Sequence, residues 1–489
     1  MTQQRIHKNR IELFTDSKET AVAIQNEFSA FEEGYKHNIR YRSGQWDGKQ
    51  KFYDVVKSKD GWIFHISEGF KGRVEKFTGE KFPAKKKTYI DELKFLKEIQ
   101  KELPFKPYRH QLKIFLGMAN EKNHLAIASV GSGKSLVIYL LTRYKRHQNK
   151  KVLILVPTVD LVNQLKDDFA DYKAPEEFMD SVQQIGGEFK DKDIKQPVVI
   201  STWQSAQKSD LSSFDVVIND ETHLSKADVL QHILSKPNFE QRLGLTGTMP
   251  IVEVDALLLE KQFGQPKTYI TAKELIELGL ATDLVVVPIF LNQKVKMMSY
   301  QDEVKFMKQD KKRREWLTNF LHKLTGLSIA LYAHTEHGVN TWESYTGLKL
   351  DNKMKNDFEK QKELGCFFMT GATNAKTRKK ILDYLSTLNN NSNVVLIGQQ
   401  KILSTGINIK ALKNLVFLSS SKSFTQIIQS VGRVLRLHES KTKAVIFDLV
   451  DNYSDHRSSE NYALTHFYQR LTFYQNQGFE IIEMEVPLK

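Results

Sequence analysis

Short apolar runs alternate with longer amphipathic stretches between about residues 111 and 245. A continuous apolar run bounded by small or polar residues is typical of a strand that is buried on both faces of a parallel sheet, and the stretches between these runs have a helical period. The predicted strands of this first block are 125–128, 152–156, 197–201, 215–219 and 243–246. This alternation predicts a doubly wound α/β domain.

A second block of the same kind spans about residues 328–450. Its predicted strands are 328–332, 366–369, 394–397, 414–418 and 444–449. The tail from residue 451 onward carries aromatic residues in a helical setting, which predicts a helix packed on the second block. Residues 1–100 form a separate unit, so we predict two tandem parallel-sheet α/β domains preceded by a small α+β domain.

The loop after the first predicted strand has the composition of a phosphate-binding loop. It reads Ala128-Ser129-Val130-Gly131-Ser132-Gly133-Lys134-Ser135. A Gly-rich turn ending in Lys-Ser directs backbone N–H groups at phosphate oxygens, while the lysine neutralises their charge and the serine hydroxyl binds Mg²⁺. Alanine replaces the first glycine of the usual pattern, and a tight glycine turn without a ligand is the alternative interpretation of the loop taken alone.

An acidic segment follows the predicted strand at 215–219. It reads Asp220-Glu221-Thr222-His223. Asp220 can hold Mg²⁺ through its water shell, and Glu221 can orient and deprotonate an attacking water. A solvated acidic turn would explain the segment alone, but together with the loop it predicts an ATP site that uses Mg²⁺ for hydrolysis.

The second block has no phosphate loop, but it carries two arginines on a predicted helix. Arg433 and Arg436 are three residues apart, so they share one helical face and could both reach a phosphate presented by another domain. An arginine supplied across a cleft accelerates phosphoryl transfer by about three to five orders of magnitude. Helix-surface arginines in a basic protein are the alternative.

Length and composition bound these hypotheses. The chain has 489 residues, a formal net charge of +14 and one cysteine, Cys366. The length indicates two to four domains, and the charge favours a polyanionic partner only weakly. One cysteine excludes an internal disulfide, and no run approaches the roughly 20 apolar residues that span a bilayer. The N-terminus also lacks the apolar core of a signal peptide. We therefore expect a cytoplasmic protein that does not contact a membrane.

Basic and aromatic residues alternate between Tyr35 and Tyr53. This composition suits a surface that binds the backbone of DNA or RNA and stacks on its bases. The aromatic residues could equally be the core of a small α+β domain, and both interpretations can hold together.

The order of these and further motifs resembles the DExH-type helicases of superfamily 2. Over about residues 105–450 the matching motifs are Arg109-x-Gln111, the phosphate loop, Val156-Pro-Thr158, Thr202-Trp203-Gln204-Ser205, the acidic segment, Leu245-Thr246-Gly247-Thr248, Ser404-Thr-Gly406 and Gln429 to Arg436. The resemblance implies two RecA-like domains with ATP between them. The domains expected on this basis are 1–95, 96–280, 281–450 and a C-terminal helical extension at 451–489.

The same resemblance implies roles for individual residues. Arg109 and Gln111 would contact adenine, Gly406 would line the nucleotide site, and Thr246 would couple this site to DNA. Gln429, Arg433 and Arg436 would close on the triphosphate. The residues implied in nucleic-acid contacts are Thr158, Thr202, Gln204, Thr370, Gly371, Ser404 and Thr405.

A narrower resemblance to the UvsW-type helicases of bacteriophages extends into the N-terminal unit. It is carried by Phe31-Glu-Glu-Gly34-Tyr35 and by Arg40-Tyr-Arg-Ser-Gly44-Gln-Trp46-Asp47-Gly48. It implies an ATP-dependent DNA helicase that remodels forks, D-loops or Holliday junctions, acting as a monomer in the host cytoplasm if a phage encodes it. The alternatives are a helicase for RNA or RNA–DNA hybrids, the motor subunit of a nuclease system, and a scaffold that binds ATP without hydrolysing it.

Overall fold

The computed structural model describes residues 3–7, 10–83, 88–187, 193–224, 227–234, 239–250, 252–295, 299–400, 409–419, 431–432, 434–453 and 461–488. Its contacts divide the chain into two compact units. The first comprises Met1–Ala128 and Gly133–Ile270, and the second contains the rest of the chain. Within the described residues, no helix is both long enough and apolar enough to cross a bilayer.

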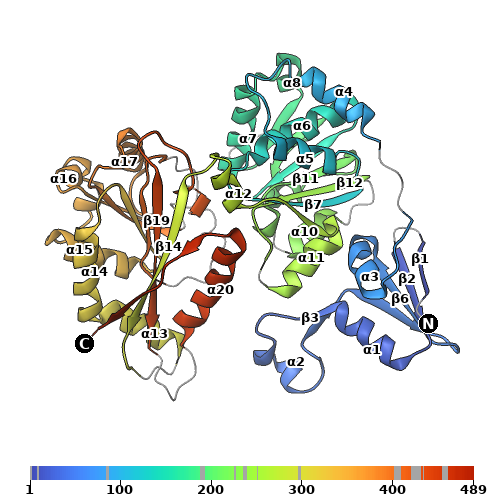
Figure 1. The fold of residues 1–489 in the computed structure, drawn as a ribbon, viewed down its shortest axis with the longest axis horizontal. Coiled ribbons are helices and arrows are strands. Elements are labelled where there is room, and N and C mark those ends of the chain that lie inside the picture. The colour runs from blue at the N-terminus through green and yellow to red at the C-terminus, as the bar shows by residue number, and fades with distance from the viewer. Residues whose placement is uncertain are drawn as a thin grey trace. The chain divides into compact units, whose positions relative to one another are not determined.

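The first unit begins with a small α+β domain (Figure 1). Its antiparallel sheet has the order β1-β2-β6-β5. The strands are β1 (Gln3–His7), β2 (Arg10–Thr15), β5 (Tyr53–Lys57) and β6 (Trp62–Ser67). The main helices are α1 (Lys18–Glu27) and α3 (Lys71–Thr78). A two-stranded ribbon of β3 (Ser29–Phe31) and β4 (Lys49–Lys51) closes a segment that carries α2 (Ile39–Arg42).

This N-terminal domain packs firmly on α11 (Glu253–Phe263) of the following domain. Val254, Leu257 and Leu258 of α11 belong to the same buried cluster as the core of the N-terminal domain. The guanidinium of Arg73 donates to Glu260 at 2.9 Å across this contact. The shared core and this largely buried ion pair hold the two domains as one body.

The first α/β domain contains a seven-stranded sheet in the order β13-β7-β12-β11-β8-β10-β9, and every neighbouring pair is parallel. The strands are β7 (Asn123–Ala128), β8 (Val152–Val156), β9 (Val182–Ile185), β10 (Val198–Thr202), β11 (Val216–Asn219), β12 (Gln241–Thr246) and β13 (Pro266–Ile270). The surrounding helices include α4 (Ile90–Ile99), α5 (Arg109–Met118), α6 (Lys134–His147), α7 (Val159–Asp171), α8 (Glu176–Asp180), α9 (Trp203–Ala206) and α10 (Ala227–Leu234).

The five strands predicted for this block are confirmed, whereas β9 and β13 were not predicted. Both lie at the edges of the sheet. β9 reads Val-Gln-Gln-Ile and β13 reads Pro-Lys-Thr-Tyr-Ile, so neither is a continuous apolar run. An edge strand is partly exposed, and the pattern that identifies central parallel strands does not detect it.

The second unit contains an eight-stranded parallel sheet in the order β16-β17-β15-β18-β19-β14-β20, with β21 also paired to β14. The strands are β14 (Asp283–Asn292), β15 (Ser328–Tyr332), β16 (Cys366–Met369), β17 (Val395–Gln399), β18 (Asn414–Phe417), β19 (Lys443–Asn452), β20 (Glu480–Ile481) and β21 (Met484–Pro487). The longer helices are α12 (Ala272–Glu277), α13 (Tyr300–Gln309), α14 (Lys311–Lys323), α15 (Thr335–Thr346), α16 (Phe358–Glu363), α17 (Ala375–Thr387) and α20 (Tyr462–Gln477).

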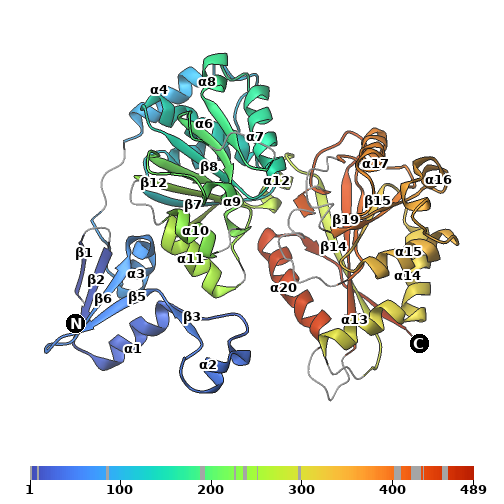
Figure 2. The ribbon, with the colours of Figure 1, turned by 180° about the vertical axis from the view of Figure 1, so that it is seen from behind.

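Helices cover both faces of this second sheet (Figure 2). Ile289 and Leu291 of β14 join the cluster that contains α14 and α15, whereas Phe290 packs with Phe467 of α20. Successive residues of a strand point to opposite faces, so α20 lies across the sheet from α14 and α15. The expected fold class, two tandem RecA-like domains after a small α+β domain, is confirmed.

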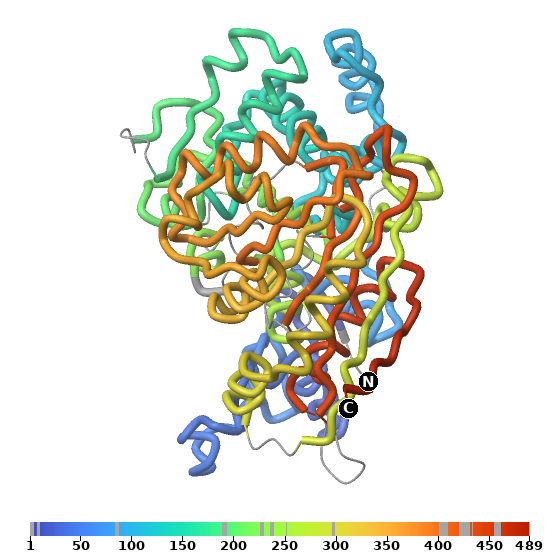
Figure 3. Tube along the Cα trace, turned by 90° about the vertical axis from the view of Figure 1, so that its left-hand side faces the viewer, coloured from blue at the N-terminus to red at the C-terminus, as the bar shows by residue number. Residues whose placement is uncertain are grey.

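The C-terminal tail is helical over α20, as expected, but it then returns to the sheet. Figure 3 shows the last part of the chain running beside β14, where β21 pairs in parallel register with residues 289–292. β14 was not predicted either. It contains Pro288, and a proline inside an apolar run ordinarily argues against a central strand.

Candidate active site

The phosphate loop lies where the sequence places it, between β7 and α6. Gly133 caps α6 in a left-handed conformation with φ of +76°. L side chains rarely adopt this conformation, and a Cβ atom on Gly133 would also force Nε2 of Gln111, 2.2 Å away, to shift, so glycine is favoured here. Gln111 is buried on α5, and its Oε1 accepts from the backbone N–H of Tyr108 at 2.8 Å. The structure therefore brings Gln111 against the loop, while Arg109 is exposed at the start of the same helix.

Lys134 reaches from the loop to the acidic segment. Its Nζ lies 3.5 Å from Oε1 of Glu221 and 3.4 Å from the carbonyl oxygen of Ala128. Lys134 is 9% exposed, so its charge acts in a largely water-excluded site. Lys134, which follows β7, and Glu221, which follows β11, thus meet at the carboxyl edge of the sheet.

The two adjacent carboxyls of the acidic segment have opposite pKa shifts. Burial and the charge of Glu221 raise the pKa of Asp220 to about 7, against the opposing effect of Lys134. Burial also acts to raise the pKa of Glu221, but the charge of Lys134 and the hydrogen bond with it lower the pKa below its ordinary value. Glu221 therefore holds the negative charge, as a residue that accepts a proton from water must.

Glu221 also has an unusual backbone conformation. Its φ is +46°, in the left-handed region that residues other than glycine rarely adopt. Such strain persists only where the surroundings impose it. Here the backbone N–H of Glu221 donates to Oδ1 of Asp220 at 2.9 Å, and the hydroxyl of Thr222 donates to the carbonyl of Leu245 at 2.8 Å.

The oxygen groups of this site fit Mg²⁺. Ser135 supplies a hydroxyl, and Asp220 supplies a carboxyl whose charged form is disfavoured without a cation. Mg²⁺ prefers oxygen ligands and usually takes only one or two from the protein, with waters and substrate phosphates completing its shell. Ser135 and Asp220 would hold the ion, and its charge would neutralise phosphate oxygens and ionise Asp220.

His223 links the acidic segment to the end of β12. Its Nδ1 lies 2.7 Å from Oγ1 of Thr246, and Thr246 in turn donates to the carbonyl of Thr248 at 2.7 Å. Because that hydroxyl has one proton, the Nδ1 of His223 must be the donor to Thr246. Burial lowers the pKa of His223, helped by the charge of Lys134 and opposed by Glu221, so the ring is neutral with its proton on Nδ1.

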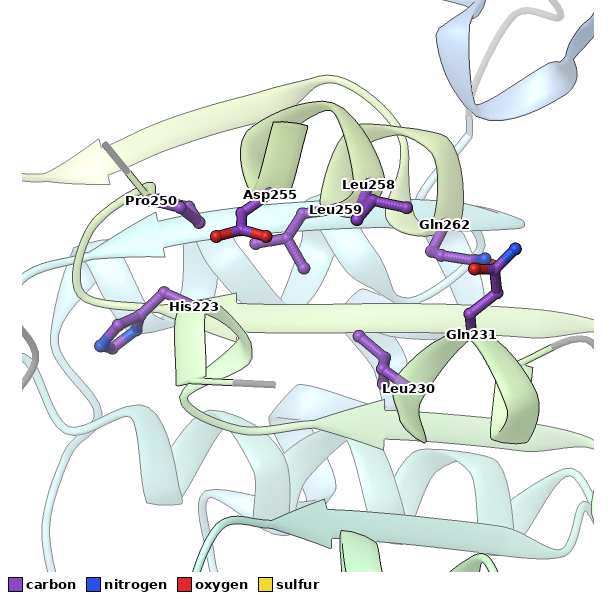
Figure 4. A pocket seen from close by; sticks show the side chains of 8 residues that line it. All are labelled: His223, Leu230, Gln231, Pro250, Asp255, Leu258, Leu259 and Gln262. Carbon is purple, nitrogen blue, oxygen red and sulfur yellow. The ribbon is translucent and has the colours of Figure 1, made fainter. Parts of the chain in front are cut away.

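A small pocket lies behind His223, between α10 and α11 (Figure 4). It is lined by His223, Leu230, Gln231, Pro250, Asp255, Leu258, Leu259 and Gln262. Its cavity volume is about 10 Å³, which is the room that one water needs. This pocket is therefore too small for a nucleotide.

Two residues implied in nucleic-acid contacts lie close together on the same sheet edge. Thr158 follows β8 and Thr202 ends β10, and these strands are paired with Thr202 opposite Val156. Each threonine caps the next helix: Thr158 accepts from the N–H of Leu161 at 3.3 Å, and Thr202 accepts from the N–H of Ser205 at 3.4 Å. Gln204 is exposed beside them.

In the second unit, Thr370 and Gly371 follow β16, and Thr370 is buried while Gly371 is exposed. Arg436 lies beside the start of β14, where its carbonyl accepts from Thr282 at 2.8 Å. The remaining predicted site residues lie outside the described part of the chain: Ser404, Thr405, Gly406, Gln429 and Arg433.

Sequence reasoning missed one side chain of this site. The hydroxyl of Tyr172, at the end of α7, lies 2.7 Å from Oγ of Ser135. The two residues are 37 positions apart, and no motif connects them. Only the packing of α7 against α6 brings them together.

Comparisons with known proteins agree with this architecture. Residues 81–251 match the family described as the res subunit of type III restriction enzymes, and residues 312–438 match the family described as the helicase conserved C-terminal domain. The chain is 28% identical to the ATP-dependent DNA helicase uvsW of phage T4 over 508 aligned positions, which cover 97% of each protein.

Two further proteins are similar over a large part of the chain. A probable helicase of Escherichia phage T5, D10, is 25% identical over 60% of each protein. A fragment structure described as an HsdR subunit of a type I restriction enzyme from Vibrio vulnificus shares the fold, with a TM-score of 0.57, 17% identity and coverage of 93% of this chain and 83% of that one. With its phosphate loop, acidic segment and two RecA-like sheets, the chain is an ATP-dependent helicase.

Proposed function

We propose that this helicase acts on DNA and unwinds or branch-migrates branched structures such as forks, D-loops and Holliday junctions. The similarity to a phage DNA helicase along nearly the whole chain supports the DNA substrate and a phage source. We also propose a role in phage recombination, repair or replication, as a monomer in the host cytoplasm. The observation that carries the branched substrate is the segment between β3 and β4.

This segment, residues 31–49, is here called the aromatic-basic arm. The ring of Phe31 stacks on that of Tyr35 with centroids 4.5 Å apart, and the ring of Tyr41 meets Tyr35 edge-on at 4.8 Å. Gly48 makes this packing feasible, because a Cβ atom there would lie 2.5 Å from the Tyr35 ring. The arm therefore holds its own aromatic cluster, outside the main core that contains Phe52.

The cationic side chains of the arm are open to solvent. Lys36, Arg40 and Arg42 are exposed, and in the described part of the chain none of them pairs with a carboxylate. Phe31 is 47% exposed, with Nζ of Lys49 5.0 Å from its ring centre. Free cations beside exposed rings are suited to phosphates and unstacked bases, which a branch point presents together.

The arm is also fixed relative to the motor loops of the first unit. It belongs to the domain that shares a core with α11, and α11 packs on β7 and β12 of the sheet whose carboxyl edge carries Thr158 and Thr202. A rigid connection would let the arm hold a junction while the motor moves along a strand. Contacts through Thr158, Thr202 and Gln204, with Thr370, Gly371, Ser404 and Thr405 in the second domain, would be made to phosphates and would not read sequence.

For hydrolysis, we propose the roles that the site geometry favours. Lys134 binds the phosphates, Ser135 and Asp220 hold Mg²⁺, and Glu221 takes the proton of the attacking water. The rest of the loop, Ser129 to Gly133, and Gly406 would line the nucleotide, with Arg109 and Gln111 at its adenine. From the second domain, Gln429, Arg433 and Arg436 would stabilise charge on the transferred phosphoryl group. The domains proposed are those of the sequence analysis: 1–95, 96–280, 281–450 and 451–489.

The branched substrate is tested with a double variant of the arm, Arg40→Ala/Arg42→Ala. The matched control is Lys18→Ala/Lys59→Ala, which removes two exposed cations elsewhere in the same domain. We expect the arm variant to lose about tenfold or more in affinity for forked DNA, to keep its affinity for single-stranded DNA, and to keep its unstimulated ATPase rate. Equal fork affinity in the arm variant and the control would contradict the proposal.

The same assay addresses the alternative substrates. ATP hydrolysis is measured with no polymer, single-stranded DNA, forked DNA, a Holliday junction, matched RNA and an RNA–DNA hybrid in one buffer at one salt concentration. Stronger stimulation by RNA or by the hybrid than by branched DNA would favour the RNA alternative. A motor subunit of a nuclease system is less well supported, because the match to the res-subunit family is confined to residues 81–251 and the 17% identical HsdR structure shows the fold alone, whereas the likeness to a phage DNA helicase covers nearly the whole chain.

A further inference from the structure

A hydroxyl that binds a metal through its lone pair still carries a proton, and this proton needs an acceptor. Ser135 is the second residue of α6, and its Oγ lies 2.7 Å from the hydroxyl of Tyr172. Within an α-helix, a serine hydroxyl otherwise tends to donate to the carbonyl four residues earlier. Here that carbonyl would belong to Gly131, in the phosphate loop itself.

We propose that Tyr172 is a positioning residue for the metal site: its hydroxyl accepts the proton of Ser135 and so turns the serine lone pairs toward Mg²⁺. This inference rests on the proposed metal role of Ser135 and Asp220. Tyr172 does not contact the reacting atoms in this scheme. It acts only through Ser135, by fixing the rotamer in which the serine can bind the ion.

Aromatic packing holds the Tyr172 ring in place. The ring lies 5.5 Å from that of Tyr139, which is fully buried on α6, and meets the ring of Phe105 edge-on at 5.7 Å. Tyr172 ends α7, and the next residue, Lys173, turns the chain away with a φ of +56°. These contacts hold the ring in the position from which its hydroxyl reaches Ser135.

The test measures nucleotide affinity and uses no turnover. The full chain binds a fluorescent ADP analogue in the presence of Mg²⁺ and again in EDTA, and the ratio of the two affinities gives the contribution of the metal. In Tyr172→Phe we expect this ratio to fall about two- to tenfold, the worth of one ordinary hydrogen bond, while the affinity in EDTA stays unchanged.

Two further variants separate a metal effect from a packing effect. Tyr139→Phe removes a hydroxyl from the same aromatic cluster, where it accepts from Arg143 at 2.6 Å, and should leave the ratio unchanged. In a Ser135→Ala background, Tyr172→Phe should cause no further fall, because the serine through which it acts is gone.

Three outcomes would overturn the inference: an unchanged or increased ratio in Tyr172→Phe, an equal loss with and without Mg²⁺, or an additional loss in the Ser135→Ala background. If the wild-type chain itself shows no effect of Mg²⁺, the proposed metal site fails and the role of Tyr172 fails with it. A normal wild-type ratio with an unaffected Tyr172→Phe variant refutes the tyrosine alone.

Discussion

Replacing Glu221 with glutamine removes a negative charge and a proton acceptor from the site while keeping the shape of the side chain. The carboxylate lies 3.5 Å from Nζ of Lys134 and 3.4 Å from Nδ1 of His223. Its pKa is held below the ordinary value by Lys134, against the effect of burial. Glutamine can still accept a hydrogen bond from water, but it cannot take the proton.

We expect Glu221→Gln to lower the rate of ATP hydrolysis but to hold or increase the affinity for ATP. Loss of a general base lowers the hydrolysis rate by about two to four orders of magnitude. The attraction between Glu221 and Lys134 is on the order of 5 kcal/mol before desolvation, for their 3.5 Å separation and an effective dielectric constant of about 20. Once this attraction is lost, Lys134 is released toward phosphate, so ATP affinity should hold or increase.

Single-turnover hydrolysis with DNA present gives the rate of the chemical step, and a fluorescent nucleotide gives the affinity. The matched control is Asp255→Asn, which makes the same change from carboxyl to amide on the far side of His223. We expect the control to hydrolyse ATP at close to the wild-type rate. Unchanged hydrolysis in Glu221→Gln would remove this residue from the mechanism, and a large loss of affinity would show that its role is structural.

Three other substitutions test different parts of the chain. Gly133→Ala should abolish tight nucleotide binding in a titration, since the new Cβ would lie 2.2 Å from Nε2 of Gln111 at a φ of +76°; near-normal affinity would contradict the proposed loop geometry. Arg470→Leu should destabilise the second domain by about 3–5 kcal/mol in urea unfolding, because it leaves Asp448 buried without the cation that donates to it at 2.7 and 2.9 Å, and a loss below 1 kcal/mol would contradict this. Burial lowers the pKa of Lys145 from 10.5 to about 8, so between these pH values the unfolded chain binds more protons and the folded state gains stability as pH rises. Unfolding free energies measured from pH 7 to 10 should show that Lys145→Met lacks this gain, and parallel pH profiles for variant and wild type would refute it.

The predictions that succeeded depend on local signals. A strand buried on both faces reads as an apolar run, and β8, β15 and β16 have the predicted bounds of 152–156, 328–332 and 366–369. The loop at 129–135 and the segment at 220–223 follow β7 and β11, because ligand-binding residues of such sheets cluster where parallel strands end. Sequence order alone was enough to place these groups on one edge.

The contacts that were not predicted join residues without a shared period or motif. Tyr172 reaches Ser135 because α7 packs on α6, and Arg73 reaches Glu260 because the N-terminal domain sits on α11. Neither contact depends on the spacing of apolar residues along the helices involved, so hydrophobic periodicity does not reveal it. Such pairs depend on how elements pack, which one sequence does not specify.

The aromatic-basic arm shows which part of one stretch belongs to the core, while its role as a nucleic-acid surface stays a prediction. Alternation of basic and aromatic residues suited either a nucleic-acid surface or the core of a small domain. In the structure Phe52 lies in the core, whereas the rings of Phe31 and Tyr35 stack on each other in the arm and Phe31 is exposed. The change from arm to core falls at β4, where the two-stranded ribbon joins the N-terminal domain. The composition of the stretch does not mark this position.

Two hydrogen bonds connect the sheet edge that carries Thr202 with the acidic segment. The indole of Trp203, next to Thr202, donates to Oδ1 of Asn219 at 2.8 Å, and Asn219 directly precedes Asp220. On the other side of that segment, His223 donates to Thr246 at 2.7 Å. The acidic segment is thus tied at both ends to residues at the carboxyl ends of β10 and β12, in a buried site where packing leaves little room for independent movement. If a strand of DNA displaces the loop at Thr202, Asn219 must either move with it or lose a buried bond, and both change the position of Asp220. We expect DNA binding at Thr202 to shift Asp220 in this way, so that the first RecA-like domain would respond to DNA through contacts of its own.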